Sequence, residues 1–284
     1  MKNKPFSDIL PESSDFAIEC MHFHKDVSMS SAHFHSHYEI FYVQSGKRNF
    51  KINNSKMYEL SSSNIALLRP NIIHQGFSAS DTGQKRTLIN ISQHLISELS
   101  EFFSPAIVHC FNVPVLQLTH YEAGMLNYLF QELLENHPNM PLYNEKIKIN
   151  LSKILLLLCD IYYRTGYEDN AMLNQTTQSR VDYAIEYIQQ NYSLPTVLSD
   201  ISDKLHISEI YLERIFKRTM NTNLHKYLST IRIMNAKRLL ESNAMSVSKV
   251  ASSCGFNNHV SFSRAFKRIE GYSPKEYQLS CKKS

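Results

Sequence analysis

The sequence predicts an α+β protein of two domains, a β-rich domain followed by an all-helical one. Its 284 residues exceed one ordinary small domain. Short strands and turns fill about the first 118 residues, whereas the segments from residue 119 onward have helical periodicity. Charge divides the chain as well, with 14 basic against 17 acidic residues over 1–178 and 16 against 9 over 179–284. The basic second half is typical of a domain that binds a phosphate backbone.

The β-rich region, residues 20–118, is predicted to be a small barrel or sandwich, because short strands alternate with turn signals. Four segments have the aromatic and β-branched content of strands, namely residues 37–44, 49–52, 65–68 and 87–91. Turn signals follow the first two, at Ser45-Gly46 and at Asn53-Asn54.

A pair of apolar helices is predicted over residues 119–165, which complete a first domain of residues 1–165. Apolar residues recur at helical spacing from Leu126 to Leu134 and from Ile147 to Ile161. This pair can pack within its own domain or against a second copy, so a homodimer is one hypothesis. Residues 166–178 are polar with little periodicity, and we interpret them as the linker to a second domain of residues 179–284.

The second domain contains an internal repeat. The segment Arg214-Ile-Phe-Lys-Arg218 recurs fifty residues later as Arg264-Ala-Phe-Lys-Arg268, and Tyr227 corresponds to Tyr277. The offset is 49 before the turn and 50 after it, so one residue is added within 255–258. A duplicated helical unit accounts for this pattern. We predict two helix-turn-helix units, at about residues 197–219 and 247–269.

Each unit has the signals of a helix, a turn and a second helix. In the second unit, Gly255 supplies the positive φ that ends the first helix, and Asn257 or Asn258 can cap the next. Ser208 is the corresponding cap in the first unit. A long helix over residues 224–242 separates the units and spans roughly 28 Å. That length is close to the ~34 Å turn of B-DNA, so two recognition helices can enter successive major grooves.

Residues 180–280 resemble the AraC/XylS family of bacterial regulators. The resemblance is carried by residues 247–256, by 262–268 and by Gly271-Tyr-Ser-Pro274. It implies an activator that contacts double-stranded promoter DNA and RNA polymerase. The family's base-reading positions fall on Ile210, Glu213, Arg214, Asn258, His259, Ser261 and Arg264. The expected phosphate contacts are Ser208, Lys217, Arg218, Arg232, Lys237, Arg238, Lys267 and Arg268.

The first domain has one notable polar cluster, His33-x-His35-x-His37-x-Glu39. Alternate residues of a strand share a face, so these four side chains can converge. The arrangement resembles the cupin barrel, which serves as an effector domain in many members of the same family.

Three interpretations of this region stay open. The first is a pocket for a small effector, such as a sugar, lined by His35, His37, Glu39, Arg48 and His74. The second is a set of ordinary strand residues at a barrel mouth. The third is a metal held by His35, His37, Glu39 and His74, which would suit a metal sensor or a metal-dependent cupin enzyme with a DNA-binding tail.

Other features exclude some classes of protein. The five cysteines are scattered without CxxC spacing, which favours reduced thiols over a disulfide frame or zinc site. No apolar run is long enough for a membrane span, and residues 1–15 lack the apolar stretch of a signal peptide. We therefore expect a cytoplasmic, effector-responsive transcription regulator that is not an enzyme and uses no cofactor.

Overall fold

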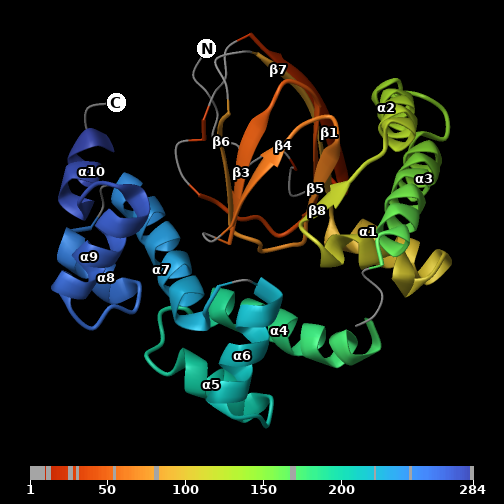
Figure 1. Ribbon diagram of the computed structural model, residues 1–284. Helices are drawn as coiled ribbons and strands as arrows, with labels where there is room; N and C mark the ends of the chain where they lie inside the picture. The colour runs from red at the N-terminus through yellow and green to blue at the C-terminus, as the bar shows by residue number, and fades with distance from the viewer. Residues whose placement is uncertain are drawn as a thin grey trace. The chain divides into compact units, whose positions relative to one another are not determined.

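The computed structural model describes residues 10, 14–24, 28–29, 32–53, 56–79, 83–166, 171–220, 222–242 and 245–281. The chain divides into two compact units between Asn170 and Ala171. The first combines β-sheet with helices, and the second is helical, as Figure 1 shows. This confirms the predicted α+β fold with a sheet domain before a helical one.

Two antiparallel sheets make up the β-structure that is described in the first unit. One has the strand order β1-β7-β2-β5-β8 and the other β4-β3-β6. The strands are β1 (Phe16–Phe23), β2 (Tyr38–Ser45), β3 (Arg48–Ile52), β4 (Lys56–Leu60), β5 (Asn64–Leu68), β6 (His74–Ser78), β7 (Gln84–Ile91) and β8 (Val115–Gln117). Each pairing within them is antiparallel.

Strand β2 buries both of its faces. Ile40 and Tyr42 belong to the core that the five-stranded sheet shares with the helices. Phe41 and Val43 belong to a second core, which includes Phe50 of β3. Because successive side chains of a strand alternate, Glu39 lies on the same face as Phe41 and Val43. The alternation therefore directs this carboxylate into the space between the two sheets.

Helices cover the other face of the five-stranded sheet. They are α1 (Gln93–Phe102), the 3₁₀ helix η2 (Pro105–Asn112), α2 (His120–Leu134) and α3 (Tyr143–Arg164). Helices α2 and α3 lie side by side in Figure 1.

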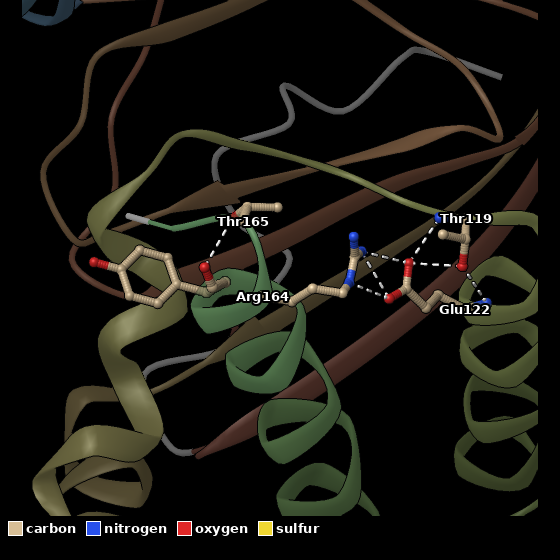
Figure 2. A network of polar contacts seen from close by, with 5 residues as sticks. Thr119, Glu122, Arg164 and Thr165 are labelled. Carbon is tan, nitrogen blue, oxygen red and sulfur yellow. Dashed lines mark hydrogen bonds and ion pairs between the residues drawn. The ribbon is translucent and has the colours of Figure 1, made fainter. Parts of the chain in front are cut away.

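The N-terminus of α2 is tied to the C-terminus of α3. Thr119 and Glu122 form a reciprocal capping box at the start of α2. Glu122 also accepts hydrogen bonds from Arg164, with Nη2 to Oε1 at 2.8 Å and to Oε2 at 2.9 Å (Figure 2). One carboxylate thus caps α2 and holds the last residue of α3.

The second unit consists of helices in the part of the chain described. They are α4 (Ala171–Asn191), α5 (Val197–Lys204), α6 (Glu209–Met220), α7 (Leu224–Glu241), α8 (Val247–Ser253), α9 (His259–Glu270) and α10 (Pro274–Cys281). The predicted helix-turn-helix units correspond to α5–α6 and α8–α9, with α7 between them. Its 18 residues span about 27 Å.

The two helix-turn-helix units repeat the same backbone hydrogen bonds. At the end of α5, Ile207 N donates to Ser202 O at 3.1 Å; at the end of α8, Phe256 N donates to Ala251 O at 3.1 Å. These pairs are 49 residues apart. His206 and Gly255, also 49 apart, both have positive φ, of 51° and 77°. The duplication seen in the sequence is therefore a duplication of backbone geometry.

The added residue in the second turn is Asn257. Ile207 matches Phe256 at an offset of 49, whereas the cap Ser208 matches the cap Asn258 at 50. Asn258 Oδ1 accepts from Ser261 N at 2.7 Å, and Ser208 Oγ accepts from Tyr211 N at 3.2 Å. Of the two predicted caps for α9, Asn258 is the one used.

Secondary structure departs from the prediction in several places. The four predicted strands are present as β2, β3, β5 and β7, but β1, β4, β6 and β8 were not predicted. Helix α1 and η2 were also not predicted. Residues 171–178 of the predicted linker lie in α4, and 167–170 lie outside the described residues. We predicted no signal peptide in residues 1–15, and most of these residues also lie outside the described ones.

No helix within the described ranges is both long and apolar enough to cross a membrane.

Two glycines of the second unit allow the turn geometry to be tested. Both have positive φ, but a Cβ on Gly255 would lie 2.6 Å from Ser193 O, whereas one on Gly271 would contact nothing within 4 Å. Gly271→Ala should therefore cost about 1 kcal/mol from strain alone, and Gly255→Ala clearly more. Urea denaturation of the full chain measures both. Equal losses would contradict the close approach to Ser193.

Candidate nucleic-acid interface and effector cavity

Helices α6 and α9 each bury one face and expose the other. Leu212 and Phe216 of α6 are buried, as are Phe262 and Phe266 of α9. A repeated tyrosine packs on this buried face in each unit, since Phe216 contacts Tyr227 and Phe266 contacts Tyr277, with ring centroids 5.3 and 5.7 Å apart. The opposite faces are therefore available to a partner.

Five of the predicted base-reading residues lie on these exposed faces with their side chains accessible. They are Ile210, Arg214, His259, Ser261 and Arg264. Asn258 is also exposed, but its amide oxygen caps α9. The N-terminal ends of two helices with exposed polar and basic groups have the chemistry required to contact base edges.

Glu213 has a structural contact instead. Its Oε2 accepts a hydrogen bond from Leu224 N at 3.1 Å, at the N-terminus of α7. A carboxylate at a helix N-terminus stabilises the unsatisfied N–H groups there. Because this contact holds the side chain against α7, we leave Glu213 out of the base-reading set proposed below.

The predicted phosphate contacts fall into two groups. Six are exposed, namely Ser208, Lys217, Arg218, Arg238, Lys267 and Arg268. The other two are partly buried, and their charged groups make contacts within the unit. Arg232 Nε donates to Tyr192 O at 2.7 Å, and Lys237 Nζ forms an ion pair with Glu270 at 2.8 Å. These contacts fasten α7 to its neighbours, so we assign Arg232 and Lys237 to the fold.

Two features of the interface were not predicted. Val260 of α9 is 57% exposed and lies fifty residues after Ile210, which is 85% exposed. The repeat offset of 50 could have identified it. Two arginines lie near the ring of Tyr211, with Arg180 and Arg214 at 5.7 and 5.0 Å from its centroid. Arg180 comes from α4, so only the folded structure brings it there.

A small cavity lies in the first unit between the two sheets. It is lined by Met29, His33, Glu39, Phe41, Phe50, His74, Arg86 and Leu88. The free space is about that of one water molecule. Of the predicted pocket residues, Glu39 and His74 line this cavity.

The remaining predicted pocket residues lie close by. His35 Nε2 is 2.9 Å from Glu39 Oε2, and the ring of His37 stacks on His35 with centroids 3.9 Å apart. Arg48 is buried and packs against Gly76. A Cβ added to Gly76 would lie 2.5 Å from the Nε of Arg48. His33 was part of the sequence cluster, but Arg86 was not identified. The guanidinium of Arg86 lies 5.3 Å from the Phe41 ring.

Only Glu39 of the His33-to-Glu39 cluster is part of a strand, because β2 begins at Tyr38. His33 forms an isolated antiparallel bridge with His74, in which each backbone N–H donates to the other's carbonyl at 2.9 Å. The expected convergence of the cluster thus comes from a tertiary backbone contact rather than from strand alternation.

Burial determines the charge states within the cluster. Loss of solvent lowers the pKa of His33 to about 3 and that of His37 to about 4, and it lowers the pKa of His74 well below 6.5. For Glu39, burial raises the pKa, but the neighbouring imidazoles of His74 and His35 outweigh it and lower the pKa to about 2. At neutral pH these three rings are uncharged, and Glu39 is a carboxylate.

Two family models match the chain. The AraC-like ligand binding domain matches residues 15–147, and the helix-turn-helix domain matches residues 201–280. The first match contains the cavity, and the second contains both recognition helices.

Similar curated proteins include two operon regulators. The raffinose operon transcriptional regulatory protein of Pediococcus pentosaceus is 32% identical over 132 residues, which cover 44% of this chain and 48% of that protein. The chain thus spans about half the length of this relative. The melibiose operon regulatory protein of Escherichia coli K12 is 23% identical over 265 residues, 88% of this chain and 84% of that protein.

A solved structure shares the fold. ToxT from Vibrio cholerae superposes with a TM-score of 0.54 and 19% identity, over 94% of this chain and 98% of that one. Both parts of the sequence match their family models, and the repeated helix-turn-helix geometry agrees with the second. The chain belongs to the AraC family of transcription regulators.

Proposed function

We propose that the chain is a sequence-specific DNA-binding regulator of transcription, in which residues 179–284 bind DNA and residues 1–165 bind an effector. The observation that carries this proposal is the duplicated helix-turn-helix with two exposed recognition helices, α6 and α9. The excess of basic over acidic residues after residue 178 supports it, because phosphate neutralisation supplies most of the affinity for DNA. Such a protein acts where the DNA lies, in the bacterial cytoplasm.

Base reading is proposed for the exposed N-terminal halves of α6 and α9. The proposed residues are Ile210, Arg214, His259, Val260, Ser261 and Arg264, with Asn258 at the start of α9. Arginine donates in a bidentate manner to guanine O6 and N7, so Arg214 and Arg264 are the proposed guanine contacts. Helix α7, which joins the two units, is about 27 Å long, a length compatible with placing α6 and α9 in successive major grooves.

Base and phosphate contacts are expected to respond differently to substitution. With a duplex selected from random sequence by the full chain, Arg264→Ala should cost about 1–3 kcal/mol and relax preference at one position. Lys217→Ala should weaken binding to all duplexes and lower the salt slope by about 1. Fluorescence anisotropy over a salt series measures both. Lys153→Ala, an exposed change in α3, is the control. A full chain without salt-dependent affinity for any duplex would contradict the proposal.

The two exposed β-branched residues indicate thymine methyl contacts. Ile210 and Val260 occupy equivalent positions, and neither side chain can form a hydrogen bond with a base. Replacing the contacted thymine by deoxyuridine removes only a methyl group and should cost about 0.8 kcal/mol.

In Ile210→Ala, the same replacement should have little further effect, because the contact is already lost. A double-mutant cycle that combines Ile210→Ala with the thymine-to-deoxyuridine replacement isolates the interaction free energy between the side chain and the methyl group. Val260→Ala, tested against its own thymine, provides the matched second cycle. If deoxyuridine lowers the affinity of the wild-type chain and of Ile210→Ala for the duplex by the same factor, the proposed methyl contact is contradicted.

The proposed effector is a carbohydrate, because two of the similar proteins regulate raffinose and melibiose operons. The free space of the cavity is much smaller than a sugar, so binding requires side chains at the cavity to move. Thermal-shift measurements with raffinose and melibiose test the class, since a bound effector raises Tm by mass action. No shift with any sugar would exclude it.

We also propose that the first unit forms a homodimer through α2 and α3. Tyr121, Met125 and Tyr128 of α2 recur at i, i+4 and i+7 and are exposed, and so are Ile149 and Leu156 of α3. An apolar stripe of this kind is typical of a helix that packs against a partner. Sedimentation equilibrium should show a dimer that Tyr128→Glu weakens. A monomer at micromolar concentration would contradict this arrangement.

Activation through contact with RNA polymerase rests on the family resemblance, and the pair of family matches supports it. Run-off transcription from a target promoter, with and without the protein, distinguishes activation from repression.

A further inference from the structure

The cluster around Glu39 combines three imidazoles and one carboxylate at the cavity of the first unit. One ring nitrogen from each of His33, His35 and His74 lies within 4.8 Å of the other two. Glu39 Oε2 is 2.9 Å from His35 Nε2 and 3.8 Å from His74 Nε2. His33 and His35 come from the segment before β2 and His74 comes from β6, yet their nitrogens converge on one place.

Backbone contacts fix two of the rings so that the same nitrogen faces the cluster. His74 Nδ1 donates to Ile72 O at 2.9 Å, and His35 Nδ1 is 3.0 Å from His37 O. In the neutral tautomer that donates from Nδ1, the Nε2 atom carries a lone pair. Histidines that bind metals usually donate their other ring N–H to a carbonyl or carboxylate in this way.

His35 Nε2 and Glu39 Oε2 lie in contact while His35 Nδ1 also contacts a carbonyl oxygen. This arrangement requires a positive charge, either on the imidazole ring or on a cation between Nε2 and Oε2. A neutral imidazole has one N–H and can donate to the carbonyl of His37 or to Glu39, but not to both. A cation bound between Nε2 and the carboxylate satisfies both atoms.

The size of the cavity agrees with a single ion. Its free space is about that of one water molecule, and His33, Glu39 and His74 line it. From these observations we propose that His33, His35, His74 and Glu39 bind one divalent first-row transition-metal ion such as Zn²⁺. Nitrogen-rich ligand sets select such metals over Mg²⁺ and Ca²⁺, which prefer oxygen.

The ion would fasten the segment before β2 to β6. His33 and His35 belong to that segment, and His74 begins β6, so the ion would reinforce the isolated bridge between His33 and His74. This inference concerns the first unit alone and does not depend on the proposed DNA recognition. The proposed ligand set also differs from the metal ligands expected from the sequence, because it contains His33 in place of His37.

That difference provides a matched pair of variants. The full chain, purified without a histidine tag and dialysed against a chelator, is titrated with Zn²⁺ in competition with a chromogenic chelator. The wild-type chain should bind one ion in this site, and His33→Gln should lower the affinity at least about tenfold. His37→Gln should leave the affinity nearly unchanged, because the His37 ring stacks on His35 but is not one of the three rings whose nitrogens converge, and the substitution keeps the backbone carbonyl that His35 contacts. His94→Gln controls for binding to exposed histidines.

Two further measurements keep the test decisive if a variant folds poorly. Co²⁺ added to the wild-type chain should give the intense visible d–d bands of four-coordinate imidazole ligation. Zn²⁺ should raise Tm of the wild-type chain and of His37→Gln, but not that of His33→Gln. Absence of a bound ion in the wild-type chain, octahedral aquo-like Co²⁺ bands, or equal losses in His33→Gln and His37→Gln would each overturn the proposal.

Discussion

The interior of the first unit depends on one buried carboxylate. Glu39 is 5% exposed. Because side chains alternate along β2, Ile40 and Tyr42 point toward the helices, and Glu39 points into the space between the two sheets. A buried charge is costly unless polar groups surround it. The ring of His35, whose Nε2 lies 2.9 Å from Glu39 Oε2, is one such group. The backbone pair between His33 and His74, and the hydrogen bond from Asn71 N to His35 O, hold the segment before β2 in place around it.

The second unit depends on a different constraint, a turn geometry used twice. Each turn ends a short helix with a residue of positive φ and then starts a recognition helix from a capped position. The buried aromatic residues of α6 and α9 then require the polar faces to point outward. Contacts within the unit, including those of Arg232 and Lys237 from α7, hold α7 against the residue after α4 and against α9.

Much of the fold follows from sequence signals that are local. The recurrence of Arg214–Arg218 at Arg264–Arg268 identified both recognition helices, and the strongly apolar strands β2, β5 and β7 were recognised from composition. Strand β4 was missed because it has the exposed charged residues of a sheet edge, and β6 because Gly76 interrupts its β-propensity. The site residues divide in the same way. Exposed Arg214 and Arg264 follow from helical periodicity, whereas the capping role of Glu213 and the place of His33 at the cavity depend on tertiary contacts.

The unequal turns of the repeat affect how freely the two copies can change. Residue 206 already carries a side chain at φ 51°, a conformation that costs any residue with a Cβ about 1–2 kcal/mol, and this side chain is exposed, so other side chains fit the first turn equally well. At Gly255 the carbonyl of Ser193 leaves no room for a Cβ. After duplication, mutational drift could therefore alter the first turn, whereas steric exclusion by the loop after α4 keeps the second at glycine.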